Sequence, residues 1–336
     1  SMMLETDILI AGGGLNGPAL GIALSQAGLR VTIVDSRPAP ARAESGFDGR
    51  AYALALASKR LLTVTGVWPR IAAFQPIQKI TASDGRAGQG AFPLWLGFDS
   101  AELEEGPMGF MVEDRHLYAA FLDRMKDCAS LTLISGETVT DQRVDGQSVT
   151  VTLGSGRQIS ARVLVGCDGR QSGVAARAGI KRSGWGYGQT ALVTAIHHEK
   201  HHEGTAHQFF MPAGPLAILP LAGGHHSSIV WSETDSTAAV IQALDDAGDI
   251  AALRPRFGGF LGQISLAGAR FTDPLNLTLA NSFIAPRVAL VGDAAHGVHP
   301  IAGQGLNLGL RDVAALAEVV IEAQRRGDDI GSLTVL

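Results

Sequence analysis

The chain has 336 residues, of which 46% are hydrophobic and 18% charged, and its formal net charge at pH 7 is −5. This length suggests two domains, or one large α/β unit with insertions, because a domain usually takes about 150 residues. The acidic balance argues against nucleic-acid binding, and no hydrophobic run reaches the roughly 18 residues that cross a bilayer. The two cysteines, Cys128 and Cys167, lack metal-ligand spacing and fit a reducing cytoplasm.

Residues 7–35, DILIAGGGLNGPALGIALSQAGLRVTIVD, have the pattern of a strand, a glycine-rich turn, a helix and a second strand. Gly12, Gly14 and Gly17 form G-x-G-x-x-G, in which the glycines make the tight turn, admit a pyrophosphate and let the helix pack on the strand. Asp35, at the end of the second strand, can accept hydrogen bonds from an adenosine ribose. The stretch therefore predicts a dinucleotide-binding site, without separating NAD from FAD.

Two arginines stand ahead of runs with helical spacing. Arg50 precedes a predicted helical run over residues 53–61, and Arg115 precedes another over residues 117–122. A guanidinium at such a place can hold a phosphate in its fork. From the local pattern alone, Arg50 is equally well interpreted as a surface cation.

Alternating hydrophobic and polar residues, separated by Pro and Gly, predict an antiparallel sheet in residues 77–98 and 183–274. We expect these residues to form a substrate domain inserted into a discontinuous dinucleotide-binding domain of residues 1–76, 99–182 and 275–336. Within the predicted sheet, the run HHEKHHEGTAH at residues 197–207 is rich in histidine. It is better explained as a solvated hairpin than as a metal site, because zinc needs three or four convergent ligands.

A glycine-rich loop lies between a buried strand at residues 288–291 and a helix that reaches Arg326. The strand is followed by Gly292 and Asp293, and the loop reads HPIAGQGLNLGLRD at residues 299–312. In a doubly wound sheet, ligands bind between a strand end and a helix N-terminus. Backbone N–H groups of this loop can therefore face an electron-rich ring or an oxyanion, and Asp293 can bind a chain of hydroxyl groups.

This loop resembles the signature H-P-[LIV]-[AG]-G-Q-G-x-N-x-G-x-x-D of the class A flavoprotein aromatic monooxygenases, and within them of the ubiquinone-biosynthesis hydroxylases. The likeness covers essentially the whole chain. It implies an α/β fold, with a Rossmann-like FAD-binding domain and an inserted antiparallel β-sheet substrate domain. It also implies an enzyme that hydroxylates the aromatic ring of a polyprenylated phenol through a flavin C4a-hydroperoxide, using O2 and NAD(P)H as a transient electron donor.

The resemblance assigns roles residue by residue. The pyrophosphate would lie on the glycine turn, the adenosine ribose on Asp35, the adenine on the backbone of Val139 and the ribityl chain on Asp293. The flavin would carry the chemistry without a catalytic side chain or a metal, and its ring would be lined by Pro300, Gly303, Gln304 and Gly305. The full set of implied FAD contacts is Gly12, Gly14, Gly17, Asp35, Arg50, Arg115, Val139, Asp168, Gly169, Asp293, Gly303, Gln304, Gly305, Leu306 and Asn307.

The Asp168–Gly169 pair matches a family motif associated with both FAD and NAD(P)H. That motif usually continues DG-x-x-S-x-x-R, but Ala175 stands here in place of the arginine, with Arg177 two residues on. We therefore expect the interaction with the pyridine nucleotide to differ at this position.

The same features fit two other functions: a flavin-dependent dehydrogenase or reductase of this fold, and a non-catalytic flavin-binding subunit of a biosynthetic complex. The resemblance implies a cytoplasmic protein that forms a homo-oligomer in its full-length form and associates peripherally with the inner membrane or with a biosynthetic complex. Members of the family continue for several helices beyond the segment that here ends at Leu336, so those helices are expected to be missing from this chain.

Overall fold

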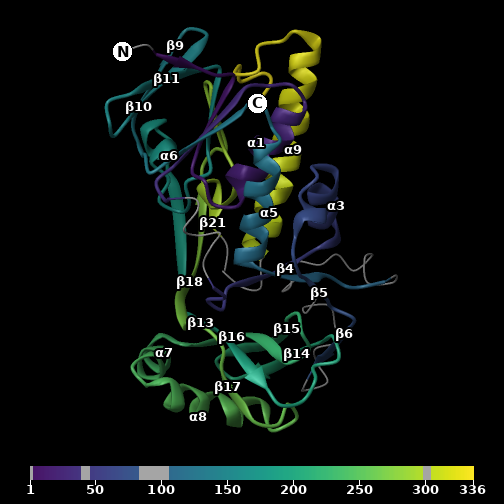
Figure 1. The fold of residues 1–336 in the computed structure, drawn as a ribbon. Helices are drawn as coiled ribbons and strands as arrows, with labels where there is room; N and C mark the ends of the chain where they lie inside the picture. The colour runs from purple at the N-terminus through teal and green to yellow at the C-terminus, as the bar shows by residue number, and fades with distance from the viewer. Residues whose placement is uncertain (1–2, 39–45, 83–105, 298–303) are drawn as a thin grey trace.

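The computed structural model describes residues 3–38, 46–82, 106–297 and 304–336. A parallel sheet with long helices forms one part, and a second sheet with two shorter helices forms the other (Figure 1). Two strands, β13 (Arg182–His198) and β18 (Phe271–Ala280), run between the two parts. The two parts are therefore joined by paired backbone.

The central sheet has six strands in the order β19-β20-β12-β2-β3-β8, and all of its neighbouring pairs except β19–β20 are parallel. The bounds are β2 (Ile8–Ala11), β3 (Val31–Asp35), β8 (Leu131–Ser135), β12 (Val163–Gly166), β19 (Ile284–Ala285) and β20 (Val288–Leu290). The strands predicted around the glycine turn are confirmed as β2 and β3. Every residue of both is buried, because both faces of the sheet are covered.

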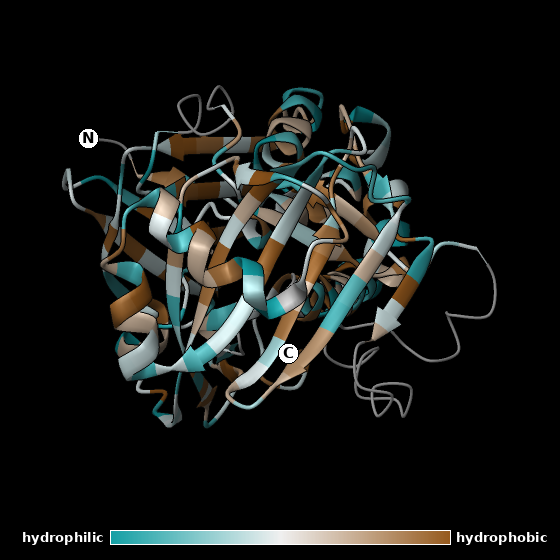
Figure 2. Ribbon diagram, turned by 90° about the horizontal axis from the view of Figure 1, so that it is seen from below, coloured by the Kyte–Doolittle hydropathy of each residue, from teal (hydrophilic) through white to brown (hydrophobic). Residues whose placement is uncertain are grey.

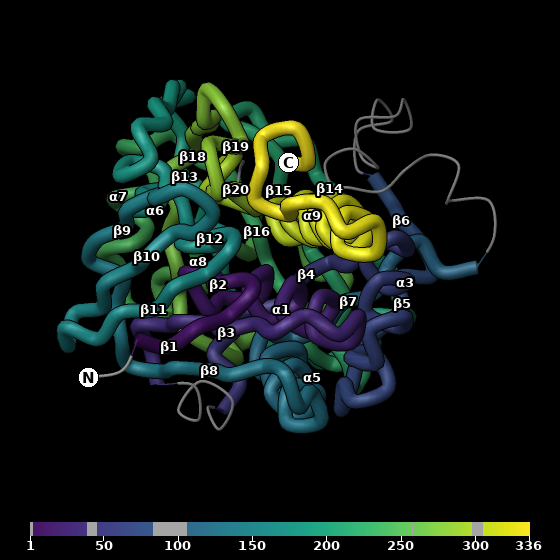
Figure 3. Tube along the Cα trace, turned by 90° about the horizontal axis from the view of Figure 1, so that it is seen from above, coloured from purple at the N-terminus to yellow at the C-terminus, as the bar shows by residue number. Residues whose placement is uncertain are grey.

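Three helices cover one face of this sheet: α1 (Asn16–Gln26), α5 (Asp114–Lys126) and α9 (Gln304–Arg326). Figure 3 shows α1 lying between α5 and α9. Ile10 and Ile33 point toward these helices, whereas Leu9 and Val34 point to the other face. That other face is covered by a four-stranded sheet made of β1 (Leu4–Glu5), β11 (Gln158–Ala161), β10 (Ser148–Leu153) and β9 (Val139–Asp145).

A small sheet, β4-β7-β5, corrects one prediction. Its strands are β4 (Ala51–Leu54), β7 (Phe110–Glu113) and β5 (Gln75–Pro76). Helix α3 (Leu56–Val64) and the 3₁₀ turn η1 (Trp68–Arg70) lie between β4 and β5 in the chain. The helix predicted over residues 53–61 is wrong at its start, because Ala53 and Leu54 pair with Met111 and Phe110. Pairing across the sheet overrides the local helical spacing. The helix predicted after Arg115 is confirmed as α5.

The second part is an eight-stranded sheet in the order β21-β18-β13-β16-β15-β14-β6, with β17 paired to β13. The strands predicted from alternation pair antiparallel, as expected. Besides β13 and β18, the strands are β6 (Lys79–Ala82), β14 (Thr205–Met211), β15 (Gly214–Pro220), β16 (His226–Thr234), β17 (Ile264–Leu266) and β21 (His296–Gly297).

The two faces of this sheet have different neighbours. Helices α7 (Asp235–Gln242) and α8 (Asp246–Phe257) pack on one face, where Leu192 and Trp231 are buried. Figure 2 shows these helices lying across the strands. Small residues such as Ala191 and Ala217 occupy the opposite face and pack with Ala53 of β4. The sheet therefore turns a face of small side chains toward the parallel-sheet part.

The predicted domain limits stay a prediction. β6 lies within residues 77–98 and joins the large sheet by pairing in parallel with β14, while residues 83–98 lie outside the described part of the chain. The predicted limit between residues 274 and 275 falls inside β18. Among the described residues, no helix combines the length and apolar character needed to span a membrane.

Candidate cofactor site

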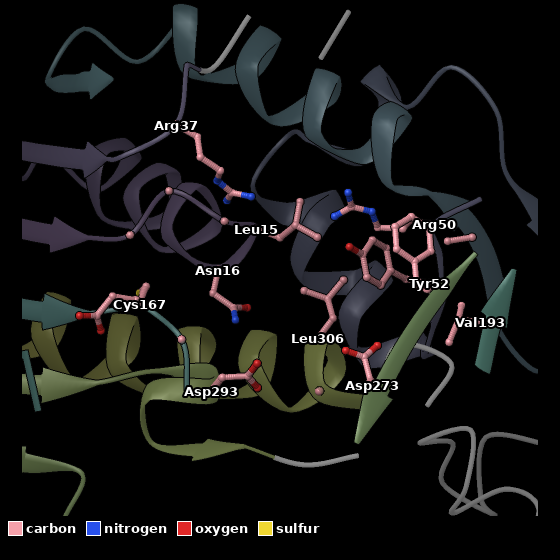
Figure 4. A pocket seen from close by; sticks show the side chains of 18 of the residues that line it. Leu15, Asn16, Arg37, Arg50, Tyr52, Cys167, Val193, Asp273, Asp293 and Leu306 are labelled. Atoms are coloured by element: carbon pink, nitrogen blue, oxygen red, sulfur yellow. The ribbon is translucent and has the colours of Figure 1, made fainter. Parts of the chain in front are cut away.

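A cavity of about 870 Å³ lies between the glycine turn and the large sheet. It is lined by residues 12–16, by the ends of β3, β12 and β20, and by β13, β16 and β18. Figure 4 shows side chains from both parts pointing into it. The predicted cofactor residues among its lining are Gly12, Gly14, Asp35, Arg50, Asp168, Gly169, Asp293, Gly305 and Leu306. One continuous space therefore brings together residues more than 250 positions apart.

The glycine turn has the close approaches that its spacing predicts. Gly12 has a φ of +108°, and a Cβ there would lie 2.3 Å from the backbone oxygen of Cys167. A Cβ on Gly17 would lie 2.2 Å from the backbone oxygen of Gly12, so helix and strand can pack only without it. A Cβ on Gly14 would meet no atom within 4 Å. Open space beside Gly14, at the start of α1, is what a pyrophosphate requires.

Asp35 ends β3 at the cavity wall and is only 3% exposed. Its carboxylate accepts a hydrogen bond from the backbone N–H of Arg37, at 3.2 Å. A Cβ on Gly13 would lie 2.0 Å from a carboxylate oxygen of Asp35. The carboxylate is thus held against the glycine turn, where it can accept hydrogen bonds from the hydroxyl groups of a ribose.

Asn16 lines the cavity and was missed by the sequence analysis. A Cβ on Gly309 would lie 2.4 Å from its side-chain nitrogen, so this glycine of the signature makes room for Asn16. The side-chain oxygen of Asn16 is buried, and no partner for it occurs in the described part of the chain. A buried acceptor without a partner is costly, and this atom fits a hydrogen-bond donor of a bound cofactor.

Asp168 stabilises its own loop as well as lining the cavity. Its carboxylate accepts hydrogen bonds from the Ser172 hydroxyl and from the backbone N–H of Val174, at 3.2 Å. These bonds fix the start of the short helix α6 (Gly173–Arg177), in which Ala175 is completely buried. The side chain of Arg177 donates to Gln142 at 3.0 Å. Arg177 therefore does not line the cavity in place of the missing arginine.

Asp293 follows β20 in the 3₁₀ turn η3 (Gly292–Ala294). Burial raises the pKa of its carboxyl, and nearby Arg170, His296 and Arg182 lower it. Arg182 also donates to the backbone oxygen of Asp293 at 2.8 Å, which anchors the turn to β13. The side chain of Asp293 lines the same cavity as Asp35.

Arg50 lines the cavity and Arg115 does not. The Arg50 guanidinium lies 4.9 Å from the ring centre of Phe271, and its Nε is 3.0 Å from the carboxylate of Asp48. Arg115 forms an ion pair with Glu113 at 2.9 Å. Val139 begins β9 and also lies outside the cavity lining.

The loop signature is only partly described by the structure. Pro300 and Gly303 lie outside the described residues, and Gln304 begins α9. Gly305 and Leu306 line the cavity. The side chain of Asn307 instead binds three groups of β4 and α3: it accepts from the Ala55 N–H at 3.0 Å and the Ser58 hydroxyl at 2.6 Å, and donates to the Ala53 oxygen at 2.9 Å.

Next to this loop, His296 and Asp312 form a pair that the sequence analysis did not single out. Asp312 accepts hydrogen bonds from the His296 ring at 2.6 Å and from the backbone N–H of Gly292 at 2.9 Å. The hydrogen bond to Asp312 raises the pKa of His296. The signature ends at Asp312 and so indicates that this residue matters, but it does not indicate that His296 is its partner. The pair joins the first turns of α9 to the turn that carries Asp293.

The histidine run corrects a further expectation. The sequence favours a solvated hairpin, yet His198 is completely buried and His202 is 4% exposed. His198 hydrogen-bonds to the Lys200 oxygen and the Ser227 hydroxyl, and His202 to the Leu221 oxygen. Burial is the main cause that lowers the pKa of both rings. Over the described residues, no group of three His, Cys, Asp or Glu side chains has the arrangement of a metal site.

Several solved structures share this fold. p-Nitrophenol 4-monooxygenase PnpA from Pseudomonas putida DLL-E4 matches with a TM-score of 0.77 at 20% identity, over 99% of this chain and 83% of that one. Aklavinone-11 hydroxylase, solved with FAD and aklavinone, matches with a TM-score of 0.73 at 19% identity, over 97% and 64%. The fold is that of these aromatic hydroxylases.

Proteins related in sequence identify the family to which the chain belongs. The family described as FAD binding domain matches residues 5–330. Ubiquinone hydroxylase UbiL of Rhodospirillum rubrum is 45% identical over 98% of this chain and 76% of its own length. The 3-demethoxyubiquinol 3-hydroxylase of Escherichia coli is 34% identical over 98% and 83%. The chain belongs to this family of FAD-dependent hydroxylases, and it is an FAD-dependent monooxygenase.

Proposed function

We propose that this enzyme hydroxylates the aromatic ring of a polyprenylated phenol in ubiquinone biosynthesis. The names of the two relatives support the pathway. The single observation that carries the proposal is the continuous cavity, which runs from the glycine turn to the face of small residues on the large sheet. Such a space has room for a dinucleotide cofactor and, at its far end, for an aromatic ring.

The residues of the cavity fit FAD along its length. The open space at Gly14 and the N-terminus of α1 would hold the pyrophosphate, Asp35 the adenosine ribose and Asp293 the ribityl hydroxyls. Gly305 and Leu306 would lie against the flavin ring. When bound, FAD supplies the redox chemistry, taking electrons from NAD(P)H and using O2 to oxygenate the substrate.

The protein itself supplies position and a dry environment. Val193, Val230 and Phe271 line the end of the cavity on the large sheet. These side chains would keep water from the reacting ring, and the exclusion of water suppresses side reactions. The proposed reaction needs no nucleophilic side chain. Cys167 borders the cavity, but burial raises the pKa of its thiol, which keeps the thiol protonated and poorly nucleophilic.

We further propose a cytoplasmic homo-oligomer that associates peripherally with the inner membrane or with a biosynthetic complex. Support comes from large hydrophobic side chains on β13 and near the end of β18. Trp185 and Tyr187 are each 52% exposed, and Leu279 is 41% exposed. Ser183 pairs with Leu279 and Trp185 with Leu277, so these side chains share one surface.

The test is aerobic incubation of the purified, FAD-loaded protein with NADH or NADPH and short-chain prenylphenols, followed by mass analysis. We expect a product that has gained one oxygen atom, with O2 consumed. NAD(P)H oxidation coupled to reduction of the organic substrate, without O2 uptake, would instead show a reductase. Retention of FAD without any substrate-stimulated NAD(P)H oxidation would show a non-catalytic subunit.

A further inference from the structure

The large sheet places one acidic side chain at the substrate end of the cavity. Asp273 lies on β18, in register with Ala191 of β13, and lines the cavity. Side chains two apart on a strand share a face, so Asp273 and Phe271 point the same way, and both border the cavity. Figure 4 shows the carboxylate of Asp273 beside Leu306 and below the ring of Tyr52.

The position of Asp273 relative to Leu306 separates it from the cofactor contacts proposed above. In Figure 4, Leu306 lies between Asp293 on one side and Asp273 on the other. Asp293 is the group we assign to the ribityl chain. Asp273 therefore lies beyond the stretch of α9 that would contact the flavin ring, where the substrate would be held.

The Asp273 carboxylate has no hydrogen bond or ion pair with any of the described residues. The nearest strand neighbour, Ala191, has no polar side-chain atom. The Nε of Arg50 is occupied by Asp48 at 3.0 Å. Burial raises the pKa of Asp273, while the charges of Arg170 and Arg50 lower it. Burying a carboxylate costs free energy unless it is paired or accepts hydrogen bonds, so this group is suited to a ligand that donates one.

The surroundings indicate which kind of donor fits. Arg50 and Arg270 also line the cavity, and these positive charges would repel an ammonium or a metal cation. The lining of the cavity on the large sheet also includes the apolar side chains of Val193, Val230 and Phe271. A neutral hydroxyl group on an aromatic ring satisfies both conditions, since the ring packs on the apolar side chains and the hydroxyl donates to the carboxylate.

We propose that Asp273 is the specificity-determining residue that accepts a hydrogen bond from the phenolic hydroxyl of the substrate. This assignment rests on the proposed function. It deepens that function by naming the substrate group that is recognised and the atom of the protein that recognises it. The same carboxylate would discriminate against aromatic compounds that carry no hydroxyl at this place.

A binding cycle tests the proposal without turnover. Calorimetric titration of the oxidised, FAD-loaded enzyme, in the absence of NAD(P)H, would use a short-chain prenylphenol and the same compound with hydrogen in place of the hydroxyl. Asp273→Ala is expected to weaken binding of the phenol roughly 10- to 100-fold and to change binding of the deoxy compound by less than about twofold. Such coupling between a side chain and a ligand group isolates their direct interaction.

Two further variants sharpen the result. Asp273→Asn keeps an oxygen acceptor in place and is expected to retain part of the preference for the phenol. Asp145→Asn removes an equal charge from the exposed end of β9, outside the cavity lining, and is expected to leave both affinities unchanged. FAD content and the thermal midpoint identify any variant that fails to fold, in which case Asp273→Asn carries the test.

The outcomes separate this inference from the proposed function. If the wild-type enzyme hydroxylates the phenol but Asp273→Ala weakens both compounds equally, or neither, the assignment of Asp273 is overturned and the function stands. If the wild-type enzyme neither binds nor hydroxylates prenylphenols, the proposed function fails, and the assignment fails with it.

Discussion

Asn307 offers the most direct test of how the signature loop is held. The resemblance places it at the flavin, but its side chain is 5% exposed and hydrogen-bonds to Ala53, Ala55 and Ser58. It thereby joins α9 to the end of β4 and the start of α3. Ala55 is the N-cap of α3, and no side chain of its own segment caps that helix. We therefore predict that Asn307→Ala acts mainly on stability.

The magnitude follows from the three hydrogen bonds. A buried neutral hydrogen bond contributes about 1 kcal/mol net, and an unsatisfied buried group costs somewhat more. Asn307→Ala should therefore lower the free energy of unfolding by about 3 kcal/mol. Ser58→Ala removes only one of the three bonds and should cost about 1 kcal/mol. Because both variants remove the same Ser58–Asn307 bond, the double variant should cost about 1 kcal/mol less than the sum.

The assay is urea-induced unfolding of the FAD-free protein, followed by tryptophan fluorescence, for wild type, both single variants and the double variant. FAD affinity of each variant is measured in parallel by flavin fluorescence. The reasoning would be refuted if Asn307→Ala left the free energy of unfolding unchanged while lowering FAD affinity tenfold or more. Strict additivity of the two single variants would also contradict the shared hydrogen bond.

Three further predictions concern the cavity and the histidine run. Asp293→Ala should weaken FAD binding about 10- to 100-fold, because a hydrogen bond to a charged group contributes about 1.5–3 kcal/mol; full flavin occupancy after dialysis would contradict this. Gly305→Val should impair FAD binding with an unchanged circular dichroism spectrum, and an FAD complex in which residues 305–307 lie more than about 4 Å from the ring would contradict its premise. His207 has its pKa lowered from 6.5 to about 4 by burial and by His202. Its protonation thus favours the unfolded chain, so the free energy of unfolding should fall as pH decreases from about 6.5 to 4. His207→Gln should remove that part of the pH dependence, and an unaltered profile would count against it.

The parts of the fold that local sequence determines were predicted best. The strands β2 and β3 and the close approach of Gly17 to Gly12 lie within 30 residues of one another, where pattern and sterics coincide. The close approach at Gly12 is instead to Cys167, more than 150 residues away. The helical spacing through Ala53 misled, because a strand partner more than 50 residues away at β7 decides its conformation. Local periodicity carries no information about such a partner.

The sequence indicates which glycines border the cavity, but it does not indicate the partners of the polar side chains. Asn307 matches the signature, but its hydrogen-bond partners lie about 250 residues earlier in the chain. Asn16 borders the cavity from the start of α1, and Asp273 borders it from β18. The residues next to them in the sequence form no motif that indicates a polar site. Arg115 matches the family position, yet it is paired with Glu113 and lies outside the cavity lining.

The contact between Gly13 and Asp35 constrains how this sequence can evolve. A Cβ on Gly13 would lie 2.0 Å from the Asp35 carboxylate and 2.6 Å from its Cβ. Shortening residue 35 to alanine would therefore not make room for a side chain at residue 13. Any residue at position 35 that has a Cβ therefore requires glycine at position 13. This holds for every side chain at position 35 that could bind a ribose. Gly13, between Gly12 and Gly14, is thus required by its packing against residue 35. A glycine at this position in a related sequence therefore does not indicate which nucleotide that protein binds.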